Sequence, residues 1–171
     1  SSTPWISSAA SDVYKRQGQT VNNAIVIDNS KYLNKVLDFN KEKMTCIVEP
    51  GIVLDELNRF LKPYGLWFPV DVSTSSRATI GGMAGNNSCG GRSIRYGMMR
   101  DNVIDIEAIL YDGSIYNFGK IKSNHINSSK SSGYEIIKKL QELAETNKEE
   151  IISKFPKVLR RVGGYNIDAL L

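Results

Sequence analysis

The chain has 171 residues, of which 41% are hydrophobic and 23% are charged, and its formal net charge is +4. This length suits one domain or a large part of one, and the apolar content is sufficient for a buried core. The weak positive charge is scattered without the basic, aromatic-lined stripe that nucleic-acid recognition needs, which argues against a nucleic-acid-binding protein.

The first 17 residues differ in pattern from the rest of the chain. They have neither a helical nor a strand period, and the run SDVYKRQ (residues 11–17) resembles a translated sequencing adaptor. We predict that residues 1–17 are a non-native leader that packs on nothing, with a native polar tail as the alternative. Residues 18–171 are predicted to form one partial domain.

Short strands and helices alternate in the next part of the chain. Ala24–Ser30 is predicted to be a short buried strand that ends in a helix cap, and Lys31–Phe39 an amphipathic turn or helix. A β-branched run predicts a strand over Met44–Gly51, which a Pro-Gly pair ends. Apolar spacing predicts a helix over Val53–Gly65. The residues on its apolar face are Val53, Leu54, Leu57, Phe60 and Leu61.

An extended segment, Leu66–Asp71, leads to a glycine-rich stretch over Ala78–Val103, ATIGGMAGNNSCGGRSIRYGMMRDNV. Glycine lets the backbone approach a ligand closely and adopt positive φ, and successive N–H groups in such a loop form a nest for anions. We predict that Gly81 and Gly82 form a turn and that a short helical turn opens at Met83, whose N-terminus would add partial positive charge.

Polar and cationic side chains accompany these glycines. Asn86, Asn87 and Ser88 suit ribityl hydroxyls or phosphate oxygens, and Arg92 or Arg95 could meet a phosphate. The stretch has neither the G-x-G-x-x-G of a Rossmann fold nor the G-K-[ST] of a P-loop. On composition alone, a phosphate cradle and a plain surface loop therefore both stay open.

The last part of the chain predicts a hairpin and a long helix. Val103–Phe118 alternates around Asp112-Gly113, the signal of a type I′ turn. Lys120–Ser132 is predicted to be a polar loop, and Tyr134–Phe155 one helix or two, ended by Pro156. The glutamates of this helix are interleaved with lysines, which indicates an exposed, ion-paired face.

The cysteines and the single histidine bear on metal binding and location. Cys46 and Cys89 lack C-x-x-C spacing, and His125 alone cannot complete a zinc set or build a catalytic triad. We expect no metal site, reduced thiols and a cytoplasmic protein, with peripheral membrane attachment as the alternative. No apolar run approaches the ~20 residues of a spanning helix, so no membrane span is expected.

The segment Phe68–Gly113 carries the order P-x-D, T-I-G-G, N-N, R-Y-G and D-N-V within one window. In this order it resembles the FAD-binding domain of FAD-linked 2-hydroxyacid dehydrogenases of the vanillyl-alcohol oxidase / p-cresol methylhydroxylase type. This family includes D-lactate dehydrogenase, the glycolate oxidase flavin subunit and D-2-hydroxyglutarate dehydrogenase. The resemblance extends over Gly18–Leu171 and implies an α+β fold of two subdomains that clasp an extended FAD.

The resemblance also implies that this fold is incomplete at both ends. Of a first glycine-rich loop, typically G-G-G-T-S-x-x-G-Q, only the end at Gly18-Gln19-Thr20 is present. The substrate-binding cap, with its metal-binding histidines and catalytic residues, would lie beyond Leu171. No catalytic residue is therefore assigned here, and the chain alone is expected to be inactive.

Contacts to the flavin end of the cofactor follow from the resemblance. Pro69, Asp71 and Ser73 would lie along the flavin, and Asn86 and Asn87 would contact the ribityl chain or the ring edge. Other positions are implied for the rest of FAD. The residues implied to wrap the pyrophosphate with backbone N–H groups are Thr79, Ile80, Gly81 and Gly82.

The far side of the cofactor is implied to lie against the end of the glycine-rich stretch. Tyr96, Gly97 and Val103 would line it. Asp101 and Asn102 are expected to brace the loop rather than touch the ligand.

The family implies that the complete enzyme oxidises a D-2-hydroxy acid of lactate, glycolate or 2-hydroxyglutarate type to a 2-oxo acid. The likeness to long bacterial members adds an iron–sulphur region downstream, while the electron acceptor stays open. One alternative is the FAD-binding subunit or module of another flavin dehydrogenase, which the segment RRVGGYN disfavours. A non-enzymatic basic interaction domain is the other alternative.

Overall fold

The computed structural model describes residues 28–119, 132–158 and 166–171. The chain divides into two compact units, Ser1–Asn102 and Val103–Leu171, which are treated one at a time. The leader 1–17, most of the strand predicted over Ala24–Ser30 and most of the loop over Lys120–Ser132 lie outside the described residues, so these remain predictions. The described end of that strand prediction is a turn, in which Asp28 Oδ1 accepts from the amide and hydroxyl of Ser30.

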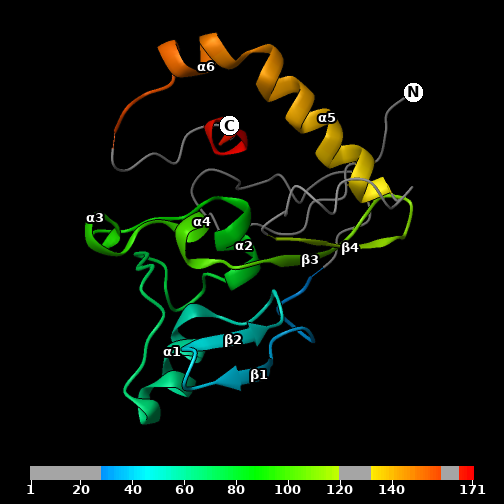
Figure 1. The fold of residues 1–171 in the computed structure, drawn as a ribbon. Coiled ribbons are helices and arrows are strands. Elements are labelled where there is room, and N and C mark those ends of the chain that lie inside the picture. The colour runs from blue at the N-terminus through cyan, green and yellow to red at the C-terminus, as the bar shows by residue number, and fades with distance from the viewer. Residues whose placement is uncertain (1–27, 120–131, 159–165) are drawn as a thin grey trace. The chain divides into compact units, whose positions relative to one another are not determined.

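The first unit opens with an antiparallel hairpin of β1 (Val36–Asn40) and β2 (Thr45–Val48) (Figure 1). The predicted strand over Met44–Gly51 is confirmed at β2. The prediction of a turn or helix over Lys31–Phe39 holds for the turn at residues 30–32 but is wrong from Val36 onward. That part pairs across the hairpin, where Phe39 faces Cys46, and cross-strand pairing outweighs the local pattern.

The predicted helix over Val53–Gly65 is confirmed as α1 (Leu54–Leu61) followed by a 3₁₀ turn, η1 (Lys62–Tyr64). Leu54, Leu57 and Leu61 are buried, as the spacing requires. Gly65 ends the helical segment with φ 73°. Phe60 lies at the edge of the buried face, and its ring is 5.6 Å from the ring of Phe39 on β1.

The glycine-rich stretch folds into three short helices, α2 (Ile80–Gly85), α3 (Ser93–Tyr96) and α4 (Met99–Asn102). Ile80 and three of its methionines are buried, with Met83 and Met99 at 0% and 1% exposure, whereas Ile94 is exposed. The stretch is therefore part of the core of the first unit rather than a plain surface loop. The segment Leu66–Asp71 that precedes it is neither helix nor strand, and the amide of Phe68 donates to Asn58 Oδ1 at 2.7 Å.

The second unit begins with the predicted hairpin, formed by β3 (Ile106–Ile109) and β4 (Ile115–Phe118). The predicted type I′ turn is wrong, because that turn needs positive φ at two successive residues and Asp112 does not have it. The chain instead turns from Leu110 to Gly113, whose φ is 80°, and the Asp112 carboxylate accepts from the amide of Ser114.

Two helices follow, α5 (Ser132–Thr146) and α6 (Lys148–Lys154), and a 3₁₀ turn, η3 (Ile167–Leu170), lies near the end of the chain. The helix is interrupted at Asn147, whose side chain donates to the carbonyl of Leu143 at 2.7 Å. The predicted segment therefore forms two helices. The predicted lysine–glutamate pairing is confirmed. Its pairs are Lys138–Glu142, Lys148–Glu145 and Lys154–Glu150.

We predict that Asp112 titrates far below an ordinary aspartate. The hydroxyls of Ser114 and Ser132 and the amide of Ser114 donate to its carboxylate, which lowers its pKa to about 2. A pKa lowered from 3.8 means that this group stabilises the fold above about pH 4 and that the contribution is lost as the pH falls towards 2. Carboxyl ¹³C NMR of Asp112 across pH 1.5–6 measures the midpoint.

The control for this titration compares two serine substitutions, one on α5 and one on α6. Ser132→Ala should raise the Asp112 midpoint, because it removes one donor, whereas Ser153→Ala should leave it unchanged, since the Ser153 hydroxyl donates to the Glu150 carbonyl. A midpoint near 3.8 in the unmodified chain would contradict the hydrogen-bonded geometry.

Candidate functional site

The start of α2 is tied to the segment that follows β2. The amide of Ile80 donates to the carbonyl of Ile52 at 2.9 Å, and the amide of Gly81 donates to the carbonyl of Pro50 at 2.8 Å. The side chain of Thr79 caps the helix by accepting from the Gly82 amide at 3.4 Å. The helix therefore begins at Ile80, and the prediction that it opens at Met83 is wrong because the cap at Thr79 sets an earlier start.

These bonds change the chemistry expected of the T-I-G-G motif. The amides of Ile80, Gly81 and Gly82 were expected to face a pyrophosphate, but each donates within the chain. Within the part of the chain that the structure describes, the amide of Thr79 has no acceptor. The motif therefore offers one free backbone donor and one hydroxyl, both on Thr79, in place of a row of amides.

Gly81 is required by contact rather than by backbone conformation. The glycines with positive φ in the described residues are Gly65, Gly97 and Gly113, so Gly81 is not one of them. A Cβ at Gly81 would lie 2.5 Å from Pro50 Cβ and 2.9 Å from the Pro50 carbonyl oxygen. The bare backbone at this position allows the two segments to approach each other.

Asp71 holds the next turn of the stretch. Its Oδ1 accepts from the amide of Arg92 at 3.0 Å, and a Cβ at Gly90 would overlap the carbonyl oxygen of Asp71. The amide of Gly90 also donates to Ser93 Oγ at 3.0 Å. Asp71, which is predicted to lie along the flavin, thus has one carboxylate oxygen committed to the turn at residues 90–92.

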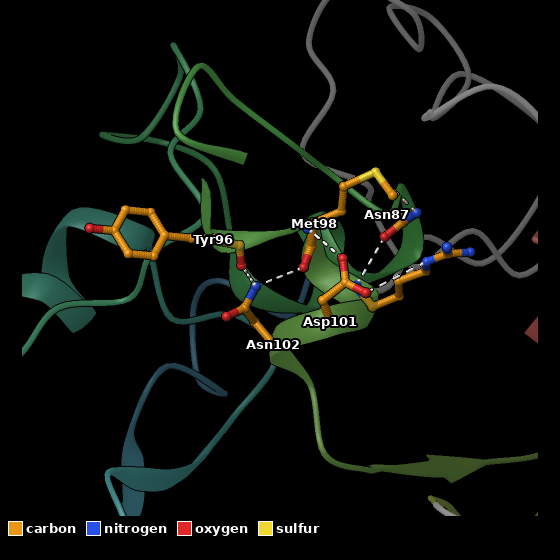
Figure 2. A network of polar contacts seen from close by, with 6 residues as sticks. Asn87, Tyr96, Met98, Asp101 and Asn102 are labelled. Atoms are coloured by element: carbon orange, nitrogen blue, oxygen red, sulfur yellow. Dashed lines mark hydrogen bonds and ion pairs between the residues drawn. The ribbon is translucent and has the colours of Figure 1, made fainter. Parts of the chain in front are cut away.

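The two neighbouring asparagines of the N-N motif differ in their surroundings. Asn87 is buried with φ 46°, and its Oδ1 accepts from the amide of Arg100 at 3.0 Å (Figure 2). Its Nδ2 lies 3.9 Å from Met98 Sδ. Asn86 is half-buried at the end of α2, and its side chain has no partner in the described ranges. Of the two, Asn86 is the one whose amide is available to a ligand.

A compact network fixes the R-Y-G and D-N-V motifs (Figure 2). Asp101 Oδ2 accepts from the amide of Met98 at 2.8 Å, and Asn102 Nδ2 donates to the carbonyls of Tyr96 and Met98 at 2.9 and 2.8 Å. Gly97 has φ 81°, and a Cβ there would lie 2.7 Å from Asp101 Cβ. The bracing role predicted for Asp101 and Asn102 is confirmed by these bonds.

An aromatic–arginine cluster, defined here as Trp67, Arg92, Arg95 and Tyr96, lies on the surface of the first unit. The rings of Trp67 and Tyr96 meet edge to face at 5.2 Å. The guanidinium carbon of Arg92 is 4.9 Å from the Trp67 ring centre, and that of Arg95 is 5.3 Å from the Tyr96 ring centre. Trp67 was not among the site residues predicted from the sequence. The one sequence signal for this cluster is the three-residue spacing of Arg92 and Arg95, which places both on one face of a helical turn.

The predicted site residues divide between the two units. All of them except Val103 belong to the first unit, with Pro69 on the extended segment and Ser73 exposed on the turn that follows. Val103 is the first residue of the second unit. No group of three potential metal ligands and no helix able to cross a membrane occurs among the described residues.

Comparisons with known proteins place this site in context. A family model described as an FAD binding domain matches residues 5–119. D-2-hydroxyglutarate dehydrogenase of Pantoea ananatis is 33% identical over 153 residues, covering 88% of this chain and 15% of that protein. A mitochondrial D-lactate dehydrogenase (cytochrome) of Kluyveromyces lactis is 36% identical over 112 residues, covering 66% of this chain and 18% of that protein.

Glycolate oxidase subunit GlcD of Bacillus subtilis is 37% identical over 89 residues, covering 52% of this chain and 19% of that protein. The chain thus spans about 15–19% of the length of these relatives. The family match begins at Trp5 and includes most of residues 1–17, whose assignment as a leader stays a prediction.

We predict that Gly90 and its neighbour Gly91 differ sharply in their tolerance of a side chain. Gly90→Ala should destabilise the chain by about 1–3 kcal/mol, because its Cβ would overlap the Asp71 carbonyl and force the backbone to shift. At Gly91→Ala the nearest atom is Asp71 Oδ2 at 3.8 Å, an ordinary contact, so the change should stay within about 0.5 kcal/mol. Urea unfolding measures both, and equal stabilities would refute the close approach.

Proposed function

The chain belongs to the FAD-binding domain family, and we propose on this basis that it is the FAD-binding part of an oxidoreductase that converts a D-2-hydroxy acid to a 2-oxo acid. The observation that carries the proposal is the FAD-domain match, together with relatives named for D-2-hydroxyglutarate, D-lactate and glycolate. These three compounds share an α-hydroxy carboxylate. The chemistry common to the relatives is thus oxidation of the carbon that carries the hydroxyl.

The proposed fold is the two-subdomain α+β arrangement of the p-cresol methylhydroxylase type. The mixture of short strands and helices and the division into Ser1–Asn102 and Val103–Leu171 are in keeping with it. We take residues 18–171 as a partial FAD-binding domain and residues 1–17 as a leader. A cytoplasmic location is part of the same proposal and agrees with the free thiols of Cys46 and Cys89.

The residues present can be tested against the chemistry of FAD, which combines a planar ring, a chain of hydroxyls and an anionic diphosphate. Thr79 offers an N–H and a hydroxyl, and Asn86 offers a side-chain amide, which suit hydroxyl and phosphate oxygens. The cationic aromatic–arginine cluster suits the negative charge. This donor set fits FAD, although the amides of Ile80 and Gly81 are occupied.

We therefore keep the full set of predicted contact residues but divide their roles. Asp71, Gly81 and Asn87 shape the site through their contacts within the chain. Thr79 and Asn86 are the direct donors. The complete proposed set is Pro69, Asp71, Ser73, Thr79, Ile80, Gly81, Gly82, Asn86, Asn87, Tyr96, Gly97 and Val103.

The part of this chain in the mechanism is binding and orientation. Bound FAD would supply the two-electron redox chemistry, which no side chain provides. The network of Asp101 and Asn102 holds Tyr96 and Gly97 in one conformation, so the cofactor meets a preformed surface. The buried side chains of Ile80 and Met83 exclude water from the core side of α2. Catalytic residues and an iron–sulphur cluster would belong to other parts of the whole protein, and the electron acceptor stays open.

The test is to isolate the complete protein that contains this chain and to examine its flavin. We expect about one FAD per polypeptide, and we expect the flavin absorbance near 450 nm to bleach on anaerobic addition of D-lactate, glycolate or D-2-hydroxyglutarate but not of an L-2-hydroxy acid. The 171-residue chain alone should show no turnover, because it spans 15% of its long relatives. A folded complete protein that neither contains nor binds flavin would overturn the proposal.

A further inference from the structure

We infer that Asn87 is a positioning residue, which orients the flavin through Asn86 and Tyr96 without touching the cofactor itself. The inference rests on the proposed function and changes the role of a residue that the family resemblance places against the ribityl chain or the ring edge. Asn87 is buried and has φ 46°. In the described ranges, Met44 and Asn87 are the non-glycine residues with positive φ, and such strained backbone concentrates at functional sites.

The backbone of Asn87 ends α2 and fixes the residue before it. The amide of Asn87 donates to the Ala84 carbonyl at 3.1 Å, and the amide of Ser88 donates to the Met83 carbonyl at 2.9 Å. These two bonds, with a left-handed residue just past the helix end, form a Schellman motif. The backbone of Asn86 is thereby held in place, and its side-chain amide is one of the two direct donors proposed for FAD.

The side chain of Asn87 holds the start of α4 at the same time. Its Oδ1 accepts from the amide of Arg100 at 3.0 Å (Figure 2). The carbonyl of Ser88 accepts from the amide of Met99 at 3.1 Å. Amides in the first turn of a helix have no partner within that helix, so these two bonds cap α4. Because Nδ2 of Asn87 lies 3.9 Å from Met98 Sδ, both polar atoms of this buried side chain face groups of the chain.

The end of α4 extends this connection to the far side of the proposed site. The Asn102 side chain donates to the carbonyl of Tyr96 at 2.9 Å. Asn87 therefore connects two parts of the site, the side-chain amide of Asn86 at the end of α2 and the segment at Tyr96. If α4 shifted relative to α2, these two parts would move apart, so the bonds of Asn87 preorganise them for the cofactor.

The experiment separates the backbone of Asn87 from its side chain. Asn87→Gly keeps the left-handed backbone and removes Oδ1. The complete protein, stripped of flavin, is titrated by calorimetry with FAD, riboflavin and ADP. Asn87→Gly should weaken FAD and riboflavin about tenfold, the effect of one hydrogen bond, because segments that the bond held must now be fixed on binding. ADP should keep its Kd within about twofold, because it lacks the ribityl chain and the ring.

A second variant restores the acceptor. Asn87→Asp should bind FAD more tightly than Asn87→Gly, because a carboxylate oxygen can accept from the Arg100 amide. Visible circular dichroism of the bound flavin gives an independent readout, since it reports how the ring is held in its asymmetric surroundings. The spectrum should change in Asn87→Gly and return towards that of the unmodified protein in Asn87→Asp.

The matched control is Met44→Gly. Met44 has φ 51° and lies in the turn between β1 and β2, where its side chain is 71% exposed. This variant also places glycine at a left-handed position, but it removes a side chain that lies in solvent. The Kd for FAD should stay within about twofold and the flavin dichroism should not change.

The outcomes distinguish a positioning role from a structural one. Unchanged FAD affinity and flavin dichroism in Asn87→Gly would overturn the inference while leaving the FAD-domain proposal intact. An equal loss for ADP, or no recovery in Asn87→Asp, would also overturn it, because Asn87 would then be a general structural support. If Asn87→Gly did not fold, a loss of more than about threefold in FAD affinity for Asn87→Asp, which keeps the acceptor, would overturn it.

The unmodified protein tests the premise. If it bound neither FAD nor riboflavin, the proposed function itself would fail, and this inference with it.

Discussion

Three backbone hydrogen bonds tie residues 50–54 to residues 78–81 and so connect the hairpin, α1 and α2. The amide of Leu54 donates to the Ala78 carbonyl at 2.9 Å. In the other two bonds the donors lie on the second segment, because the amides of Ile80 and Gly81 donate to carbonyls of residues 50–52. Side chains along both segments are buried, including Ile52, Leu54, Ala78 and Ile80. Both helices start within these paired segments, so loss of the three bonds would unfasten the first residues of α1 and of α2 at the same time.

The glycines of the stretch make sense in these terms. A side chain at Gly81 would meet Pro50, one at Gly90 would meet Asp71, and one at Gly97 would meet Asp101. These three bare positions are therefore required by a neighbour within the chain, whereas Gly85 and Gly91 have room for a side chain. Because most backbone amides at the start of α2 already donate within the chain, the donors left for a ligand are mainly side chains. These donors belong to Thr79, Asn86 and the aromatic–arginine cluster.

Local pattern predicted much of the fold, and its errors have a common cause. The helix over Val53–Gly65 and the hairpin over Val103–Phe118 were found because apolar spacing and turn residues act within a few positions of each other. The strand β1 was missed because its partner β2 decides its conformation. The turn at Asp112 was misassigned because its carboxylate accepts the Ser114 amide, a choice that composition does not reveal.

The site shows the same limit. The order of motifs identified the family, and Asp101 and Asn102 were correctly predicted to brace the loop. The engagement of Asp71 and Asn87 with distant amides was not predictable, because each bond spans 13 or more positions of the chain. Trp67 was overlooked because a tryptophan in an apolar extended segment resembles core material until its arginine partner is known.

Amide hydrogen exchange tests most directly whether α2 is held by the chain itself or by its cofactor. The amides of Ile80 and Gly81 should exchange slowly in the flavin-free protein, because each already donates to a carbonyl, and FAD should change their rates little beyond its general effect on stability. Rapid exchange without FAD, followed by strong protection confined to these two amides on binding, would contradict the account and restore them as donors to the diphosphate.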